Sequence, residues 1–255
     1  DEKKYKGEFK KADLISEHRD KIHNRPYVEG KDLSRFHTKR IRFLEWDTDR
    51  VPKKISRPTF VELYTGEKII RGSFTDGVFD RNQLCSNHSN YILKRYIDLK
   101  GIANKSITQG LSRSRVNELE PISENYCYEY LLMIINSAWA NEFLNSIRRA
   151  NMENVFYPDE FKLIPIKRLE KKNQEIFKTI EQYLEFLYAI DTENVNADAK
   201  CVDLLGNLLV LELYYVNELF KDGIYKSKTR MLANLVSAKL ADIDKELDFA
   251  GWNAL

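Results

Sequence analysis

The feature that most constrains the fold is a change of hydrophobic period close to Tyr126. Up to about Asn125 the chain is rich in turns and holds most of the Pro and Gly residues. Beyond that point apolar residues recur at helical spacing. A short period is typical of strands, and a period near 3.6 is typical of amphipathic helices. The sequence therefore predicts an α+β protein, with a β-rich front followed by long amphipathic helices.

Residues 39–46 give the clearest strand pattern of the front. Arg40 and Arg42 alternate with Ile41 and Phe43. Because successive side chains of a strand point to opposite faces, the arginines are expected on one face and the apolar residues on the other. The pattern predicts a half-buried strand.

A hairpin is predicted further along the front. The runs 68–71 and 78–81 flank Thr75-Asp76-Gly77, and Asp-Gly between such runs favours a tight turn because Gly accepts a positive φ. Residues 92–99 fit either another strand or a short helix, and the sequence leaves the choice open.

Four helical patterns follow Tyr126. Apolar stripes predict helices over about residues 128–147, 176–188, 202–220 and 231–247. Gly223 is well placed to end the third, and the polar segment 191–200 is the expected linker. We expect residues 1–125 to be a recognition region and residues 126–190 its helical scaffold. Residues 191–255 are then expected to form a C-terminal helical pair for docking or assembly.

The charge is divided unevenly along the chain. Residues 1–172 hold 33 Lys and Arg against 25 Asp and Glu, whereas residues 173–255 hold 8 against 14. A basic front suits binding to a polyanion, and an acidic end suits contact with protein. The alternative is ordinary variation of surface charge.

Patterns that would indicate catalysis are weak. No Gly-rich turn or Asn-Pro-Pro-aromatic loop indicates methyl transfer, and no phosphate-binding loop occurs. Residues 158–162 (PDEFK) contain both halves of a magnesium-nuclease signature, but the halves abut, so their side chains would not converge on a metal. Three widely spaced cysteines and four scattered histidines predict neither a disulfide framework nor a metal site. We expect no catalytic, cofactor or metal site in this chain.

Basic residues near the predicted turns and strand ends are the candidate DNA contacts. Ser112-Arg113-Ser114-Arg115 follows Gly110 and is expected to be a flexible loop. Arginine can read guanine through a bidentate contact and also binds phosphate. Taken singly, each could be a solvated surface cation. The candidates are Arg40, Arg42, Lys53, Lys54, Arg57, Lys68, Arg71, Arg81, Arg113 and Arg115.

Four short segments in order resemble one family. Residues 130–137 (YLLMIINS) are similar to a "YLLxxLNS" helix, and residues 154–166 end in a hydrophobic-Pro-hydrophobic step. Residues 173–176 (NQEI) resemble the "QxxI" start of a long helix, and residues 25–33 (RPYVEGKDL) resemble a "P-hydrophobic-x-G-x-D-I" strand. Together they resemble the TaqI-like C-terminal specificity domains and the related target-recognition domains of type I specificity subunits.

The resemblance implies sequence-specific recognition of double-stranded DNA in restriction–modification. Such a domain follows an adenine-specific DNA methyltransferase domain, or a fused type IIG nuclease–methyltransferase, that lies outside this chain. S-adenosylmethionine, and Mg²⁺ if the parent also cleaves DNA, would belong to that parent protein. The first residue, Asp1, fits a piece cut from a longer chain. No base-reading residue can be transferred by motif, because the specificity loops of the family vary.

Other functions remain open from the sequence. The chain could be half of a separate type I-like specificity subunit that works with a methyltransferase in trans, or a protein-interaction scaffold that binds no DNA. A catalytic site that the motifs do not reveal is a further alternative. The longest apolar run, residues 204–216, is interrupted and too short to span a bilayer. We expect no membrane partner and a cytoplasmic location.

Overall fold

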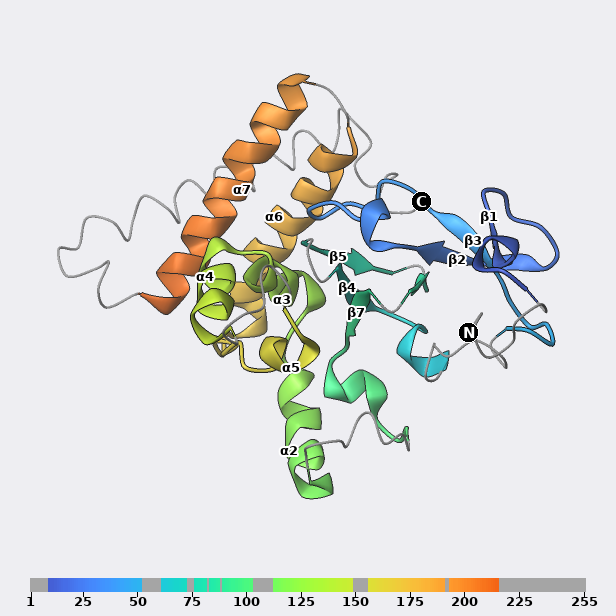
Figure 1. The fold of residues 1–255 in the computed structure, drawn as a ribbon. Coiled ribbons are helices and arrows are strands. Elements are labelled where there is room, and N and C mark those ends of the chain that lie inside the picture. The colour runs from blue at the N-terminus through green and yellow to red at the C-terminus, as the bar shows by residue number, and fades with distance from the viewer. Residues whose placement is uncertain are drawn as a thin grey trace. The chain divides into compact units, whose positions relative to one another are not determined.

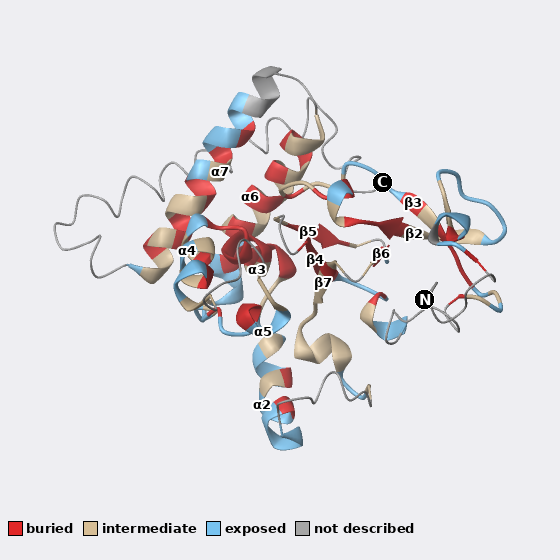
Figure 2. Cartoon of the chain, in the orientation of Figure 1, coloured by how far each residue is buried: buried red, intermediate tan, exposed pale blue. Residues whose placement is uncertain are grey.

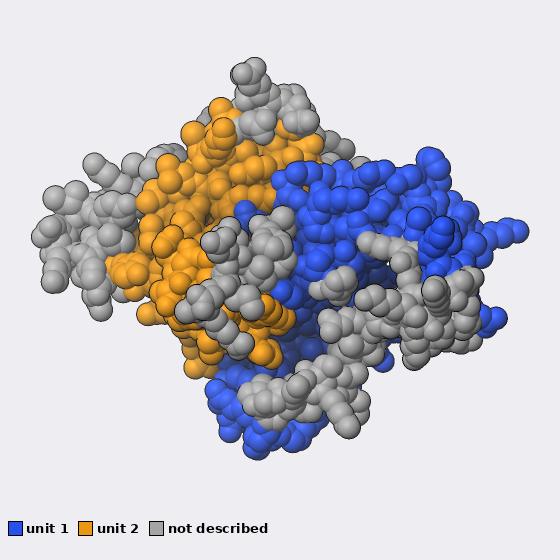
Figure 3. Space-filling model, in the orientation of Figure 1, with its two compact units in different colours: residues 1–34, 38–124 blue, residues 35–37, 125–255 orange. Residues whose placement is uncertain are grey.

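The computed structural model is α+β, with its strands in the first half of the chain and most of its helices after them (Figure 1). It describes residues 9–51, 61–72, 76–81, 83–87, 89–102, 112–148, 156–190 and 193–215. The chain forms two compact units, coloured separately in Figure 3. Unit 1 comprises residues 1–34 and 38–124, and unit 2 comprises residues 35–37 and 125–255. The predicted fold class is confirmed.

The first sheet of unit 1 has the strand order β1-β3-β2-β6. Its strands are β1 (Ile15–Ser16), β2 (His23–Val28), β3 (Arg42–Glu45) and β6 (Cys85–Ser86). β3 runs antiparallel to both neighbours, whereas β2 and β6 are parallel. The 3₁₀ helices η1 (Lys11–Leu14) and η2 (Gly30–Asp32) flank these strands along the chain.

The second sheet has the order β5-β4-β7. β4 (Lys68–Gly72) and β5 (Gly77–Asp80) form the predicted antiparallel pair, with Lys68 opposite Asp80 and Arg71 opposite Gly77. The prediction that Gly77 lies in the turn is wrong, because it is the first residue of β5. The ambiguous residues 92–99 prove to contain both elements, the end of β7 (Asn90–Leu93) and the 3₁₀ helix η4 (Tyr96–Leu99). A further 3₁₀ helix, η3 (Val61–Leu63), precedes β4.

The strands of unit 1 enclose two apolar clusters. Val28, Ile70 and Val78 pack with two leucines in one, while Trp46 and Val51 belong to the other. Figure 2 shows burial along β4 and β5, and β2 is buried at its end, at Tyr27 and Val28. This packing fixes the strands, which also bury charged residues such as Arg42, Lys68 and Asp80.

The predicted loop at residues 112–115 is wrong, because helix α2 (Arg113–Ser123) begins there. Ser112 is its N-cap, and its hydroxyl accepts a hydrogen bond from the Arg115 backbone N–H at 3.2 Å. A serine that satisfies a free N–H of the first turn favours helix formation.

Unit 2 begins its helical part with two helices where the sequence predicts one. α3 (Tyr128–Ile135) and α4 (Ala138–Ile147) are separated at Asn136 and Ser137. Ser137 caps α4 by accepting a hydrogen bond from Ala140 N at 3.1 Å, and it donates one to Ile134 O at 2.6 Å. A side chain that serves as an N-cap starts a new helix and so interrupts the apolar stripe.

The last two described helices of unit 2, α6 and α7, begin earlier in the chain than their patterns predict. α5 (Pro158–Phe161) is short, α6 (Lys171–Ala189) contains the expected second stripe, and α7 spans Glu193–Tyr214. The prediction of a linker at residues 191–200 is wrong, since α7 includes most of that segment. The predicted stop at Gly223 and the helix at residues 231–247 lie outside the described residues.

Residues 35–37 belong to unit 2 although their chain neighbours belong to unit 1. Arg35 makes a bidentate ion pair with Asp203 of α7, with both distances 2.7 Å, and donates a hydrogen bond to Asn136 O at 2.7 Å. Phe36 is buried, has a φ of 60°, and stacks on Tyr188 of α6 with ring centroids 6.2 Å apart. A bulky residue persists at positive φ only where packing holds it there.

Candidate nucleic-acid interface

Arg42, a predicted DNA contact, lies inside unit 1. Its guanidinium pairs with Asp32 at 2.6 Å and with Glu29 at 3.0 Å, and it lies over the Tyr27 ring. The prediction that Ile41 turns inward and Arg42 outward is wrong, because Ile41 is 42% exposed and Arg42 only 8%. Two carboxylates compensate the buried charge, and Arg42 is therefore a structural residue.

Lys68 is also buried, with an exposed fraction of 0%. Its ammonium group pairs with Asp80 of the neighbouring strand and donates a hydrogen bond to Tyr64 O at 2.8 Å. Burial lowers the pKa of Lys68 from its usual value. A side chain held in this way does not reach a DNA surface.

Arg71 and Arg81 surround the same hairpin. Arg71 is buried in β4, whose five residues are all buried because β4 is the central strand of its sheet. Arg81 is half-buried, and its guanidinium lies 4.1 Å from the centroid of the Phe79 ring. Replacement of Lys68 or Arg71 is therefore expected to affect the stability of the fold, so it is a poor test of DNA binding.

The remaining predicted contacts divide into three exposed residues and three outside the described residues. Arg40 is exposed and pairs with Glu17 at 2.5 Å. Arg113 and Arg115 are exposed on the first turn of α2, where Arg115 pairs with Glu118 at 2.7 Å. The three outside the described residues are Lys53, Lys54 and Arg57.

We call the exposed basic residues of segments 17–19 and 39–41 the basic corner, and they are His18, Arg19, Lys39 and Arg40. All four are exposed. Segments 17–19 and 39–41 meet because Ser16 pairs with Phe43 across β1 and β3 and because Glu17 pairs with Arg40. The sequence analysis missed His18, Arg19 and Lys39. Their signal was the position of both basic pairs immediately outside a strand.

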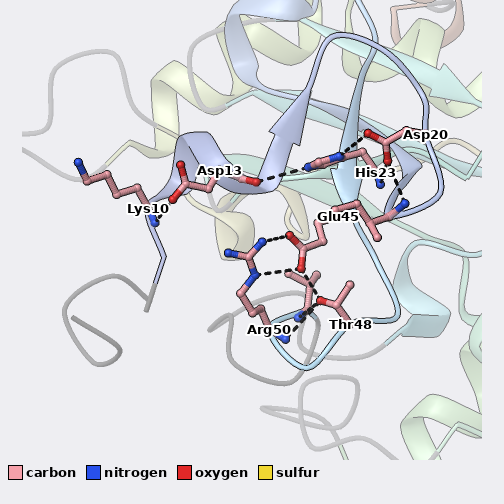
Figure 4. Close-up of polar contacts among 9 residues, drawn as sticks. Lys10, Asp13, Asp20, His23, Glu45, Thr48 and Arg50 are labelled. Atoms are coloured by element: carbon pink, nitrogen blue, oxygen red, sulfur yellow. Dashed lines mark hydrogen bonds and ion pairs between the residues drawn. The ribbon is translucent and has the colours of Figure 1, made fainter. Parts of the chain in front are cut away.

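Asp20 holds the loop that contains the basic corner. Its carboxylate accepts hydrogen bonds from the backbone N–H groups of Ile22 at 2.9 Å and His23 at 2.7 Å, and contacts His23 Nδ1 at 2.8 Å (Figure 4). These bonds, led by that from the His23 backbone, lower the pKa of Asp20 to about 2. A carboxylate that accepts several N–H bonds stays ionised and fixes its turn.

Further charged groups hold the segment 45–51, which begins at Glu45, the partner of His23 across β3 and β2. The buried Glu45 carboxylate accepts hydrogen bonds from Arg50 Nε at 3.0 Å and Thr48 Oγ1 at 2.5 Å (Figure 4). Partial burial acts to lower the pKa of His23, but its bond to Asp20 and the nearby Glu45 outweigh burial, so the pKa is raised. The loop therefore presents its cations from a held backbone.

The residues that carry the family resemblance serve as structural ties in unit 2. Gln174 is 2% exposed; its amide oxygen accepts from Cys127 N at 2.9 Å, and its amide nitrogen donates to Asn125 O at 2.7 Å and Leu169 O at 2.8 Å. One side chain thus joins α6 to the start of α3 and to the segment before α6.

The nuclease-like segment does not converge on a metal. Asp159 is exposed and pairs with Lys162 at 2.8 Å, whereas Glu160 is buried and accepts from Tyr157 N at 2.7 Å. Among the described residues no group of three or more His, Cys, Asp or Glu side chains is placed to hold a metal ion. The cysteines Cys85, Cys127 and Cys201 are free thiols.

No family model matches the chain, and no curated protein matches it. Within the described part of the chain, no helix has the length and apolar character needed to cross a membrane.

Proposed function

We propose that this chain is the DNA target-recognition part of a restriction–modification protein and carries no catalytic site of its own. It would bind double-stranded DNA for an adenine-specific methyltransferase domain, present in cis or in trans, that uses S-adenosylmethionine. Such a protein acts in the cytoplasm. The resemblance of residues 25–33, 130–137, 154–166 and 173–176 to TaqI-like specificity domains supports this proposal.

The observation that carries the proposal is the basic corner of unit 1. Its two loops leave adjacent strands, carry four exposed basic residues, and are held by Asp20 and Glu17. DNA-binding proteins obtain most of their non-specific affinity from cations that neutralise phosphates. Positioned phosphate contacts then set the register in which other residues read bases.

Salt dependence of binding to a random-sequence duplex, followed by fluorescence anisotropy, tests the proposal. If about five phosphates are neutralised, log K falls with log salt with a slope of about −4 to −5. We expect Lys39→Ala/Arg40→Ala to reduce the magnitude of that slope by about 2. A binding constant that does not change with salt concentration would favour a protein-interaction scaffold instead.

A matched control is available in unit 2. Lys162→Ala/Lys200→Ala removes the same charge from two exposed positions, one ion-paired like Arg40 and one in α7. We expect this variant to bind DNA like the wild type. Equal losses in both variants would show that net charge, and no particular surface, governs the affinity.

A further inference from the structure

The segment that joins α5 to α6 has an irregular backbone held by side chains from other helices. Tyr130 Oη of α3 donates a hydrogen bond to Lys167 O at 2.8 Å. Tyr214 Oη of α7 donates to Pro165 O at 2.5 Å and accepts from Lys167 N at 3.4 Å. Gln174 of α6 fixes the same segment through Leu169, as described above. Side chains that follow this backbone are therefore presented in fixed positions.

This segment borders a cavity of about 450 Å³ between α6 and α7. Its inner wall contains Phe177 and Leu209, which are buried. Three cationic side chains also line the cavity, and all three are exposed, so they lie toward its opening. These residues, which we call the cationic rim, are Lys167, Arg168 and Lys172.

The charge of the cationic rim is only partly compensated. Lys172 pairs with Glu170 at 2.8 Å, but both side chains are at least 70% exposed. Within the described residues, Lys167 and Arg168 form no ion pair. Glu212 also lines the cavity, but it is buried on the inner wall. Lys167 and Arg168 therefore leave positive charge at the opening of the cavity, and exposed positive charge attracts anions.

We propose that the cationic rim is a second DNA contact, in which Lys167, Arg168 and Lys172 bind phosphates of the duplex backbone. The inference rests on the proposed function and extends it to unit 2. Lysine and arginine on a fixed backbone lose less freedom on binding, which favours affinity. Contacts to phosphate carry no sequence information, so this surface positions the duplex and acts equally on all sequences.

The test compares two triple variants of the full chain by fluorescence anisotropy with random, A·T-rich and G·C-rich duplexes. We expect Lys167→Ala/Arg168→Ala/Lys172→Ala to reduce the magnitude of the salt slope by about 2 to 3 on every duplex. The control, Lys162→Ala/Lys178→Ala/Lys200→Ala, removes the same charge from unit 2 outside the cavity. It should bind like the wild type, and thermal unfolding verifies that both variants fold.

A second variant tests the held backbone itself. Tyr214→Phe retains every charge and the ring that stacks on Trp139, with centroids 3.6 Å apart, but removes the hydroxyl that holds Pro165 and Lys167. We expect DNA affinity to fall about threefold to tenfold at an unchanged salt slope. Unchanged affinity would show that the hydroxyl does not position the cationic rim.

The outcomes separate this inference from the proposed function. Wild-type binding by the cationic-rim variant, together with a loss in Lys39→Ala/Arg40→Ala, would reject the second contact and retain the first. A loss in the control triple variant equal to that in the cationic-rim variant would also reject it. A wild-type chain that binds no duplex at low salt would reject both, and direct binding of labelled polyglutamate in that case would indicate an acidic protein partner.

Discussion

At the scale of single residues, the basic side chains of unit 1 serve two different purposes. Arg42 and Lys68 are enclosed and neutralised by carboxylates, whereas Lys39 and Arg40 are exposed. A buried ion pair gives little net stability, but removing one partner leaves the other charge buried and uncompensated. Substitutions at the two kinds of site should therefore have separable effects on folding and binding.

Lys68→Met is expected to destabilise the protein by about 3 to 5 kcal/mol, because it leaves the Asp80 carboxylate buried without its cation. Urea unfolding measures the loss. The double variant Lys68→Met/Asp80→Asn should recover part of it, since no charge is then buried. If Lys68→Met weakens DNA binding of the folded fraction but not stability, the structural role is wrong.

His23 gives a pH dependence of stability with a defined sign. Its folded-state pKa is raised above the usual 6.5, so its contribution is fully present below pH 6.5 and is lost as pH rises through the folded pKa. Asp20 acts in the opposite direction. Its pKa is lowered to about 2, so its contribution is present above its usual pKa and is lost as pH falls toward 2.

The measurement is urea unfolding between pH 5 and pH 8 for the wild type and His23→Gln. We expect the stability difference between them to shrink as pH rises, while an NMR titration places the His23 pKa above its usual value. A difference that grows with pH would contradict the contacts with Asp20 and Glu45.

At the scale of elements, Gln174 joins three backbone segments of unit 2 through one amide. We expect Gln174→Leu to cost about 1 to 3 kcal/mol in unfolding free energy, because it leaves three partly buried backbone groups without this partner. Gln174→Glu is the informative comparison. Its carboxylate can accept from Cys127 N but cannot donate to Asn125 O or Leu169 O, so only part of the stability should return.

Periodicity and turn chemistry predicted elements more successfully than they predicted burial. The pairing of β4 with β5 and the helix from Lys171 were predictable because their signals are local, although Gly77 lies in β5 and not in the predicted turn. The helix at α2 also had a local signal, Ser112 ahead of Val116 and Leu119 at helical spacing, which the arginines obscured. In contrast, the burial of Arg42 depends on Asp32, which only the tertiary fold brings to it.

The positions of the two basic surfaces were only partly predictable from the sequence. Arg40 was predicted and lies in the basic corner, whereas Lys39 and Arg19 were missed although they are close to it in sequence. The cationic rim was missed because Lys167 and Lys172 follow a proline-containing irregular segment, and the cavity beside them is completed by Leu209, a residue distant in sequence. Sequence spacing does not report such convergence.

At the scale of the whole molecule, the chain leaves unit 1 at Arg35, returns at Thr38, and enters unit 2 again at Asn125. We expect Arg35→Ala to destabilise unit 2 by about 2 to 3 kcal/mol, because Asp203 and Asn136 O lose a charged donor. Chemical denaturation measures this, and Arg35→Ala/Asp203→Ala should be less than additive. Additive losses would mean that the pair does not interact.

The intrusion of residues 35–37 into the helical unit limits how the chain can be recombined. A chimera that exchanges residues 1–124 for those of another protein would also exchange Arg35 and Phe36, which contact α6 and α7. The helices α6 and α7 of this chain would then lose the contacts that Arg35 and Phe36 make with them. A chimera that replaces unit 1 should therefore keep Arg35-Phe36-His37 of this chain. It needs three crossover points, before Arg35, after His37 and before Asn125, instead of one.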